Sequence, residues 1–177
     1  MGREDQGLSV SRQRYQVTPR TLCFLRHGND VLLLKGSPHK RIWANRYNGL
    51  GGHVERGEDL MSAALREVRE EAGLTPYDMR IAAVVHVDGG DPLFGVLFFV
   101  FTGRVDDTAA RESAEGTLEW HPLADLPIAQ MAPDLPVILP HIMALPPGAP
   151  PLFLAYSYDE EDQLVIRQWG EDAAFTA

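Results

Sequence analysis

The sequence is poor in cysteine, since Cys23 is the only one among 177 residues. A single thiol excludes an internal disulfide and a cluster of thiolate metal ligands, and it points to a reducing compartment. Long apolar runs are also lacking: VLLL from Val31 and the stretch from Leu93 to Phe101 are too short to cross a bilayer. The N-terminal segment MGREDQGLSVSRQRYQ has no apolar core of a signal peptide. We therefore expect a soluble, cytoplasmic protein without a membrane partner.

Basic residues are scarce as well. Sixteen lysines and arginines face 25 aspartates and glutamates, so the formal net charge is -9. This balance disfavours binding to a nucleic acid polymer or to an anionic membrane surface. A small anionic substrate remains compatible with it, because a bound divalent cation reverses the local field of an acidic site. The composition does not indicate the oligomeric state, so an oligomer stays open.

The length and the hydrophobic content of 45% suit a single globular domain. We expect residues 1–16 to form a flexible N-terminal tail, because they lack hydrophobic periodicity. Residues 17–170 are then one domain, and residues 171–177 a C-terminal tail.

Strands dominate the predicted elements. The apolar runs Arg20 to Arg26 and Val31 to Lys35 flank the turn-forming HGND and predict a β-hairpin. Met79 to Val87 and Leu93 to Thr102, separated by DGGDP, predict a second pair. The final segments LFLAYSY and QLVIRQW predict a third.

Two further elements complete the expected fold. A short strand is expected at Leu118 to His121, and Asp134 is expected to cap a helix that extends to about Ala144, with Pro140 bending or breaking it. Since strands outnumber helices, the pattern indicates an α+β or mixed α/β class.

One helix carries an unusual density of glutamate. In GGHVERGEDLMSAALREVREEAGL, from Gly51 to Leu74, Asp59 is placed to begin a helix that ends at Gly73. Leu60, Ala64, Val68 and Ala72 recur every four residues and form a stripe that faces the core. Ala63, Glu67 and Glu71 form the adjacent row, and Glu70 shares the face of Glu67.

Like charges at these spacings repel, so the row calls for a compensating cation. Each such pair costs about 0.2–0.5 kcal/mol on an exposed helix. No lysine or arginine occupies the row of Glu67 and Glu71, and Arg66, which can pair with Glu70 four residues on, relieves only part of the repulsion. A hard cation such as Mg²⁺, which prefers carboxylate oxygen and shares its shell with substrate phosphates, would relieve the remainder. The alternative is an acidic surface helix with ordinary charge pairs.

The same stretch matches the pattern G-x5-E-x7-R-E-U-x-E-E-x-G-U, with U aliphatic, at every position. The matching residues are Gly52, Glu58, Arg66, Glu67, Val68, Glu70, Glu71, Gly73 and Leu74. This is the signature of the Nudix hydrolases, a family that the chain resembles, and among them it is most similar to the MutT-like branch.

The resemblance implies an α/β/α sandwich with a mixed β-sheet. It also implies that Glu67, Glu70 and Glu71, with the backbone carbonyl of Gly52, bind Mg²⁺ or Mn²⁺. Glu58 and Arg66 resemble the pair that braces the loop against the helix. The implied reaction is the attack of water on a diphosphate linkage of a nucleotide.

The general base is less narrowly indicated. Glu70 or Glu71 is one choice, and a glutamate of a later loop is another, with Glu112, Glu115 and Glu119 as candidates. We choose Glu115, because its distance from Trp120 resembles the spacing in MutT-like triphosphatases. The alternative is a solvated loop carboxylate.

The contexts YNGLGGHVE and EWHPLADLP resemble the branch that hydrolyses nucleoside triphosphates, including oxidised purine forms. There, the residues equivalent to Asn48 and Asp134 contact the base, while Ala132 stands where oxidised-purine enzymes carry a stacking tryptophan. His53 is placed to reach a phosphate. As alternatives, Asn48 satisfies a turn, Asp134 caps a helix and His53 is a surface residue.

Some neighbours of the signature receive no catalytic role. Trp43 and Tyr47 either flank the nucleoside or pack the loop, and we expect the three phenylalanines Phe94, Phe98 and Phe99 in the core. The segment from Lys35 to Arg46 has a basic bias that is consistent with a solvated loop.

Three functions remain open at this point. The first is a metal-dependent nucleoside triphosphate pyrophosphohydrolase that releases a monophosphate and pyrophosphate. The second is a Nudix pyrophosphatase for ADP-ribose, a nucleotide sugar or a dinucleoside polyphosphate. The third is a non-catalytic nucleotide-sensing module, against which the complete set of carboxylates argues.

Overall fold

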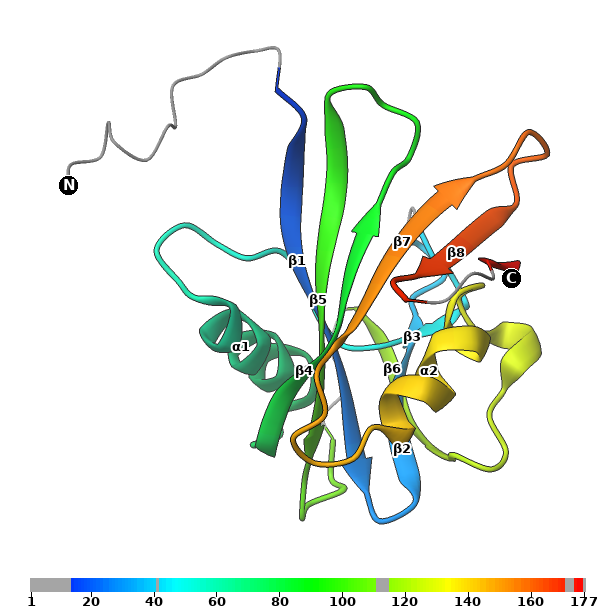
Figure 1. Cartoon of the computed structure of the whole chain (residues 1–177). Coiled ribbons are helices and arrows are strands. Elements are labelled where there is room, and N and C mark those ends of the chain that lie inside the picture. The colour runs from blue at the N-terminus through cyan, green and yellow to red at the C-terminus, as the bar shows by residue number, and fades with distance from the viewer. Residues whose placement is uncertain (1–13, 41, 111–114, 171–173, 177) are drawn as a thin grey trace.

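The molecule is built on one curled, mixed β-sheet (Figure 1). The structure, a computed structural model, describes residues 14–40, 42–110, 115–170 and 174–176. The strands are β1 (Gln16–His27), β2 (Asp30–Gly36), β3 (Tyr47–Asn48), β4 (Tyr77–Val87), β5 (Phe94–Arg104), β6 (Gly116–Pro122), β7 (Leu152–Tyr158), β8 (Leu164–Gln168) and β9 (Ala174–Thr176). Their order in the sheet is β3-β2-β1-β5-β4-β7-β8-β9, and β6 pairs with β2.

The three hairpins expected from the sequence are confirmed. β1 and β2 pair antiparallel, with His27 opposite Asp30 at the turn. β4 pairs antiparallel with β5, and β7 with β8. The parallel ladder between β1 and β5, from Gln16 and Phe94 to Arg26 and Arg104, joins the first two hairpins and makes the sheet mixed.

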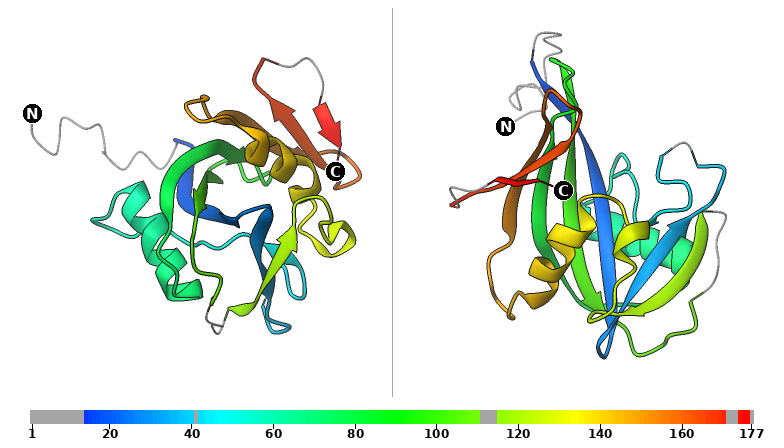
Figure 2. Two further views of the ribbon diagram at one scale, coloured as in Figure 1. Left: turned by 90° about the horizontal axis from the view of Figure 1, so that it is seen from below. Right: turned by 90° about the vertical axis from the view of Figure 1, so that its right-hand side faces the viewer.

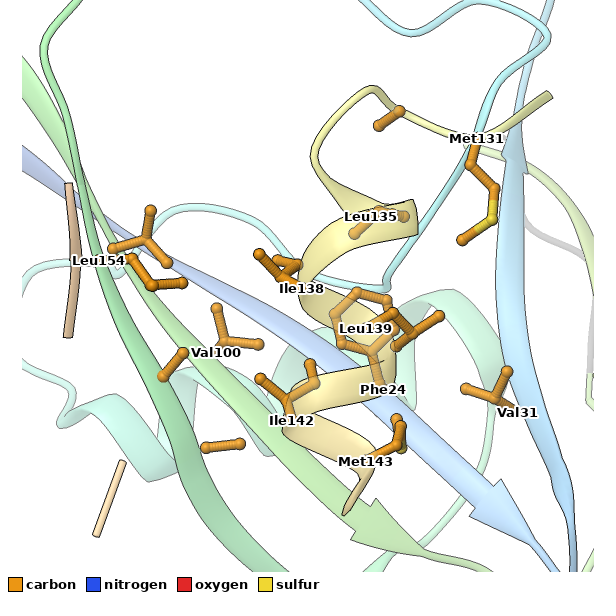
Figure 3. Packing of buried hydrophobic residues seen from close by; sticks show 14 of the residues in the cluster. Phe24, Val31, Val100, Met131, Leu135, Ile138, Leu139, Ile142, Met143 and Leu154 are labelled. Atoms are coloured by element: carbon orange, nitrogen blue, oxygen red, sulfur yellow. The ribbon is translucent and has the colours of Figure 1, made fainter. Parts of the chain in front are cut away.

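The two α-helices lie on opposite sides of this sheet. These are α1 (Leu60–Ala72) and α2 (Leu135–Ala144), and Figure 2 shows the sheet curving between them. Each helix has its own apolar cluster: Ala64 and Val68 of α1 pack with Leu25 and Phe101, whereas α2 packs on Phe24, Val100 and Leu154 (Figure 3). The expected α/β/α arrangement is therefore confirmed.

α2 begins after Asp134 and ends at Ala144, as predicted, but the capping interaction differs from the prediction. The side chain of Asp134 makes no capping hydrogen bond; only its backbone carbonyl accepts, from the N–H groups of Val137 and Ile138. Pro140 does not break the helix, because α2 continues through it to Ala144. Burial of Leu135, Ile138 and other apolar residues of α2 compensates for the missing backbone bond.

The expected tails fall largely outside the described residues. Of the N-terminal segment, residues 14–16 are described, and the Tyr15 hydroxyl lies 2.9 Å from His86 Nε2. Of the C-terminal segment, residues 174–176 form β9 against β8. In the part of the chain that the structure describes, no helix is long and apolar enough to span a membrane.

Candidate active site

The helix α1 begins and ends where the sequence predicts. The carboxylate of Asp59 accepts hydrogen bonds from the backbone N–H groups of Met61 and Ser62, at 2.9 and 3.0 Å. Gly73 ends the helix in the left-handed conformation, with φ of 68°. The stripe of Ala64, Val68 and Ala72 is fully buried, which fixes the rotation of the helix and hence the direction of the glutamates.

Glu71 is the most buried of the signature carboxylates, at 6% exposed. Its Oε2 accepts a hydrogen bond of 2.8 Å from the backbone N–H of Gly51. Burial raises the pKa of Glu71 to about 7, and the nearby charge of Glu67 adds to that rise while the Gly51 hydrogen bond opposes it. A carboxylate held in this environment gains most from a neighbouring cation.

Arg66 connects the loop before α1 to three of the glutamates. Its guanidinium lies 2.8 Å from Glu58 Oε1, 2.9 Å from Glu67 Oε1 and 3.2 Å from Glu70 Oε2, and it donates to the carbonyl of His53. The hydrogen bond from Arg66 is the main cause of the lowered pKa of Glu58. The predicted brace of Glu58 and Arg66 is present.

The predicted pairing of Arg66 with Glu70 is present, and Arg66 reaches one further glutamate of the helix. Arg66 also neutralises part of the charge of Glu67, which follows it directly in the sequence. Helical spacing suggests that adjacent side chains do not face each other. A long arginine with several donors reaches its neighbour nonetheless.

Gly52 lies close to the helix because it has no side chain. Its carbonyl accepts a hydrogen bond of 2.9 Å from the backbone N–H of Thr21, so this oxygen already has a partner in β1. A Cβ atom at Gly52 would collide with the carboxylate of Glu67. The glycine therefore allows the loop to lie directly on the acidic face of α1.

The signature glutamates suit a hard divalent cation by their chemistry. Glu67 and Glu71 are both largely buried carboxylates, and they interact electrostatically. Glu70, with a side chain 59% exposed, borders them. Within the described residues no three carboxylate, imidazole or thiol groups already surround one point at metal-binding distances. The donor types and the acidic field fit Mg²⁺ or Mn²⁺.

A cleft of about 300 Å³ opens beside Gly51 and Gly52. The salt bridge between Lys40 Nζ and Glu115 Oε2, 2.6 Å long, lies in its wall. Arg20 and Arg46 line it as well. Cations thus gather at the edge of the acidic helix, where a substrate phosphate chain would need them.

A second, apolar hollow of about 250 Å³ adjoins this cleft. Four residues line both spaces, namely Leu22, Trp43, Asn48 and Phe98. Asp134 lies in the apolar hollow, where it accepts a hydrogen bond of 3.3 Å from the Tyr156 hydroxyl. Burial raises the pKa of Asp134 and that of Tyr156.

The predicted substrate residues fall into different places. Asn48 and Asp134 are brought together in the apolar hollow, although the Asn48 side chain also accepts a hydrogen bond of 2.8 Å from the N–H of Gly49. The His53 side chain is exposed and lines neither space. Ala132 is fully buried, and its backbone N–H donates to the Tyr47 carbonyl.

Of the two later glutamates that the structure describes, Glu115 lines the cleft and Glu119 does not. Glu119 instead accepts a hydrogen bond of 2.7 Å from the hydroxyl of Tyr47, whose pKa burial raises to about 12. Tyr47 is 4% exposed and packs in the core, so it does not flank the cleft. Glu112 lies outside the described residues.

Two residues of the site were missed or misplaced by the sequence. Arg20 stands alone in an apolar run and has no motif to mark it, yet it enters the cleft and its guanidinium lies 5.7 Å from the centre of the Phe98 ring. Phe98 packs against a core cluster, as expected, but also lines both spaces, whereas Phe94, expected in the core, is 56% exposed. The basic bias around Lys40 and Arg46 was the one available signal, and both residues line the cleft.

A larger hollow of about 480 Å³ lies elsewhere, at the C-terminal end of α2. Two of its three arginines, Arg26 and Arg80, donate to backbone carbonyls at that end, including those of Met143 and Pro146. None of the predicted site residues lines it.

Comparison with known proteins agrees with this geometry. The family model of the NUDIX domain matches residues 17–142. The uncharacterised Nudix hydrolase YvcI of Bacillus subtilis is 30% identical over 150 residues, which are 82% of this chain and 89% of that protein. The oxidised purine nucleoside triphosphate hydrolase of Mus musculus is 30% identical over 116 residues, 64% of this chain and 72% of that protein.

Among solved structures, the MutT protein of Bacillus halodurans shares the fold. It is 22% identical with a TM-score of 0.72, and the match covers 88% of this chain and 99% of that one. With the complete signature, the family match over most of the chain and the shared fold, the protein belongs to the Nudix hydrolase family, whose members are pyrophosphohydrolases that use a divalent metal.

Proposed function

We propose that the protein hydrolyses nucleoside triphosphates to a nucleoside monophosphate and pyrophosphate, with oxidised purine nucleotides among its substrates. The observation that carries this proposal is the continuity of the two spaces through Leu22, Asn48 and Phe98. The cleft places basic side chains beside the loop that carries Gly51 and Gly52, and the apolar hollow contains the buried carboxyl group of Asp134. A triphosphate and a base have these two chemistries in one molecule.

In this proposal Glu67, Glu70 and Glu71 hold Mg²⁺ or Mn²⁺, with Gly52 as a further candidate ligand. The chemistry that such a cation supplies is neutralisation of charge on the phosphate oxygens and activation of water. Arg66 keeps the glutamates in place through its bonds to Glu67 and Glu70.

The remaining steps concern the chain's own residues. Arg20 and Arg46 bind phosphate oxygens, and His53 is a further candidate from the exposed loop. Water adds its oxygen to the α-phosphorus, and the bond to the bridging oxygen breaks, so that pyrophosphate leaves. Glu115 accepts the proton of that water, with Glu70 and Glu71 as the alternative bases, and the salt bridge to Lys40 orients it.

In this proposal the nucleobase of the substrate binds in the apolar hollow. Asn48 accepts the Gly49 N–H through its oxygen, which leaves its amide N–H₂ for a ligand. Asp134 offers a carboxyl group whose raised pKa favours the protonated form. The Mus musculus relative, by its name, acts on oxidised purine nucleoside triphosphates, which is a reason to include these substrates in the test.

The test is product analysis by anion-exchange chromatography. Purified protein is incubated with Mg²⁺ or Mn²⁺ and ordinary or oxidised nucleoside triphosphates, ADP-ribose, a nucleotide sugar or diadenosine polyphosphates. We expect monophosphate and pyrophosphate from the triphosphates, a loss of on the order of a hundredfold or more in Glu71→Gln, and full activity in Glu160→Gln, which changes an exposed glutamate on the β7–β8 turn.

Other outcomes separate the alternatives. Cleavage confined to ADP-ribose, nucleotide sugars or dinucleotides would move the protein to the second function. Nucleotide binding without turnover under either metal would favour the sensing module and overturn the proposal.

A further inference from the structure

Trp43 stands at the junction of the cleft and the apolar hollow and lines both. Its side chain is 41% exposed, and neither of the two core clusters built from described residues includes it. Large aromatic side chains are normally buried against other apolar groups, so an aromatic side chain kept half-exposed at such a junction has a contact surface to offer.

The backbone holds Trp43 in this place at a conformational cost. Its φ is 63°, in the left-handed region that bulky residues rarely adopt. The surrounding turn is closed by hydrogen bonds from Arg46 to the Trp43 carbonyl, 3.1 Å, and from Asn45 to the Gly36 carbonyl, 2.9 Å. Residues that the surrounding structure holds in a strained backbone conformation are concentrated at active sites and ligand-binding positions.

Two strands contribute further apolar lining to the same two spaces. Phe98 and Leu22 line both spaces from β5 and β1, and the Arg20 guanidinium packs over the Phe98 ring. A planar ring that enters the apolar hollow next to Asn48 therefore meets both an exposed indole and apolar side chains. Ala132, which is fully buried, offers no aromatic surface there.

We propose that Trp43 stacks on the base of the bound nucleotide and thereby selects purine over pyrimidine substrates. For the identity of the ligand this inference rests on the proposed function. Stacking gains with ring area, so a purine gains more than a pyrimidine, while ordinary and oxidised purines gain about equally. Discrimination between these two purine forms then falls to Asn48 and Asp134.

The experiment measures binding apart from turnover. Isothermal titration calorimetry is performed with the α,β-methylene analogues of GTP, 8-oxo-GTP and CTP, in which the bond to be cleaved is blocked. We expect Trp43→Ala to weaken both guanine analogues by about tenfold or more and the cytosine analogue by less, and Trp43→Phe to retain most of the affinity. Trp169→Ala is the matched control, because Trp169 is 82% exposed and lines neither space.

A glycine variant separates a ligand-binding role from a structural one. Trp43→Gly removes the Cβ that makes the left-handed φ costly, so its melting temperature is expected to stay equal or rise while its affinity falls as in Trp43→Ala. A purely structural tryptophan would lose melting temperature together with affinity.

The outcomes are distinct from those of the hydrolysis test. Unchanged affinity in Trp43→Ala, equal losses for purine and pyrimidine analogues, or no binding of any analogue to the unaltered protein would each overturn the inference. Trp43-dependent binding in a protein that cleaves no triphosphate would instead leave the inference standing and overturn the proposed function.

Discussion

At the scale of single residues, some side chains of the site belong to a sequence motif and others do not. Arg66 and Glu58 belong to a motif, and the structure places them 2.8 Å apart. Arg20 belongs to none, yet it lies in the same cleft as Glu115. The Arg20 Nε is buried and has no hydrogen-bond partner among the described residues. A buried donor of this kind is costly until an acceptor reaches it.

Replacement of Arg20 by glutamine is expected to weaken substrate binding. A charge-assisted hydrogen bond to a phosphate is worth about 1.5–3 kcal/mol, so KM for a triphosphate should rise roughly tenfold or more while kcat changes less. Steady-state kinetics on the substrate found in the product analysis measures both constants.

The control for this prediction is Arg56→Gln, which removes an exposed arginine that lines neither space. Circular dichroism establishes that the variants stay folded. An unchanged KM in Arg20→Gln would show that Arg20 only packs on Phe98.

At the scale of elements, the loop before α1 and the helix itself act as one unit. Gly51 donates to Glu71, Gly52 leaves room for Glu67, and the His53 carbonyl accepts from Arg66. The same loop pairs with β1 through bridges between Cys23 and Leu50 and between Arg20 and His53. The acidic helix is therefore tied to the sheet next to the strand that carries Arg20.

Gly52→Ala is expected to lower activity far more than stability. The added Cβ meets the far end of the flexible Glu67 side chain, which can rotate away at little folding cost. A displacement of about 1 Å in a catalytic group can cost about a hundredfold, so kcat/KM should fall by one to two orders of magnitude.

Gly89→Ala serves as the matched control, because a Cβ there meets nothing within 4 Å. The measurements are kcat/KM and the melting temperature of both variants. A loss of melting temperature in Gly52→Ala that accounts for its lost activity would contradict this account of Glu67.

At the scale of the whole molecule, the sheet separates two apolar clusters, and residues of β1, β2 and β5 line the cleft. Glu71 and Glu67 lie on the α1 side, and Asp134 comes from the start of α2 on the other. The chain carries a net charge of -9, and one of its acidic side chains, Glu71 of α1, is buried. A cation bound there stabilises the folded state as a whole, because the unfolded chain does not assemble the site.

Mg²⁺ or Mn²⁺ is therefore expected to raise the melting temperature. At a concentration 100 times Kd the gain is about 2.7 kcal/mol, which corresponds to roughly 5–10 °C for a chain of this size. Differential scanning calorimetry, with NaCl of equal ionic strength and with chelator as references, measures the shift.

Glu71→Gln is expected to lose most of this shift, whereas Glu160→Gln should keep it. A shift that is the same in both variants would assign the stabilisation to general screening of charge. No shift with either metal would count against metal binding by these glutamates.

The sequence predicts a structural feature correctly where the interactions that form it lie within a short segment. The caps of α1 at Asp59 and Gly73 were predicted correctly, because each acts within one helical turn. The same reasoning failed at Asp134, because the buried hydroxyl of Tyr156, 22 residues away, takes its carboxylate instead. Pro140 is tolerated for a similar reason, since the packing of α2 on the sheet outweighs the local preference.

The sequence by itself determined the family, the acidic helix with its ends, and the three hairpins, because spacing and turn chemistry encode them within short segments. Only the tertiary structure decided which side chains share the cleft. Arg20, Trp43 and Phe98 come from three distant segments. Strand pairing and register set the face of the sheet to which Arg20 and Phe98 point, whereas Trp43 comes from the loop between β2 and β3. Their convergence is a property of the assembled sheet, so no single stretch of sequence could contain it.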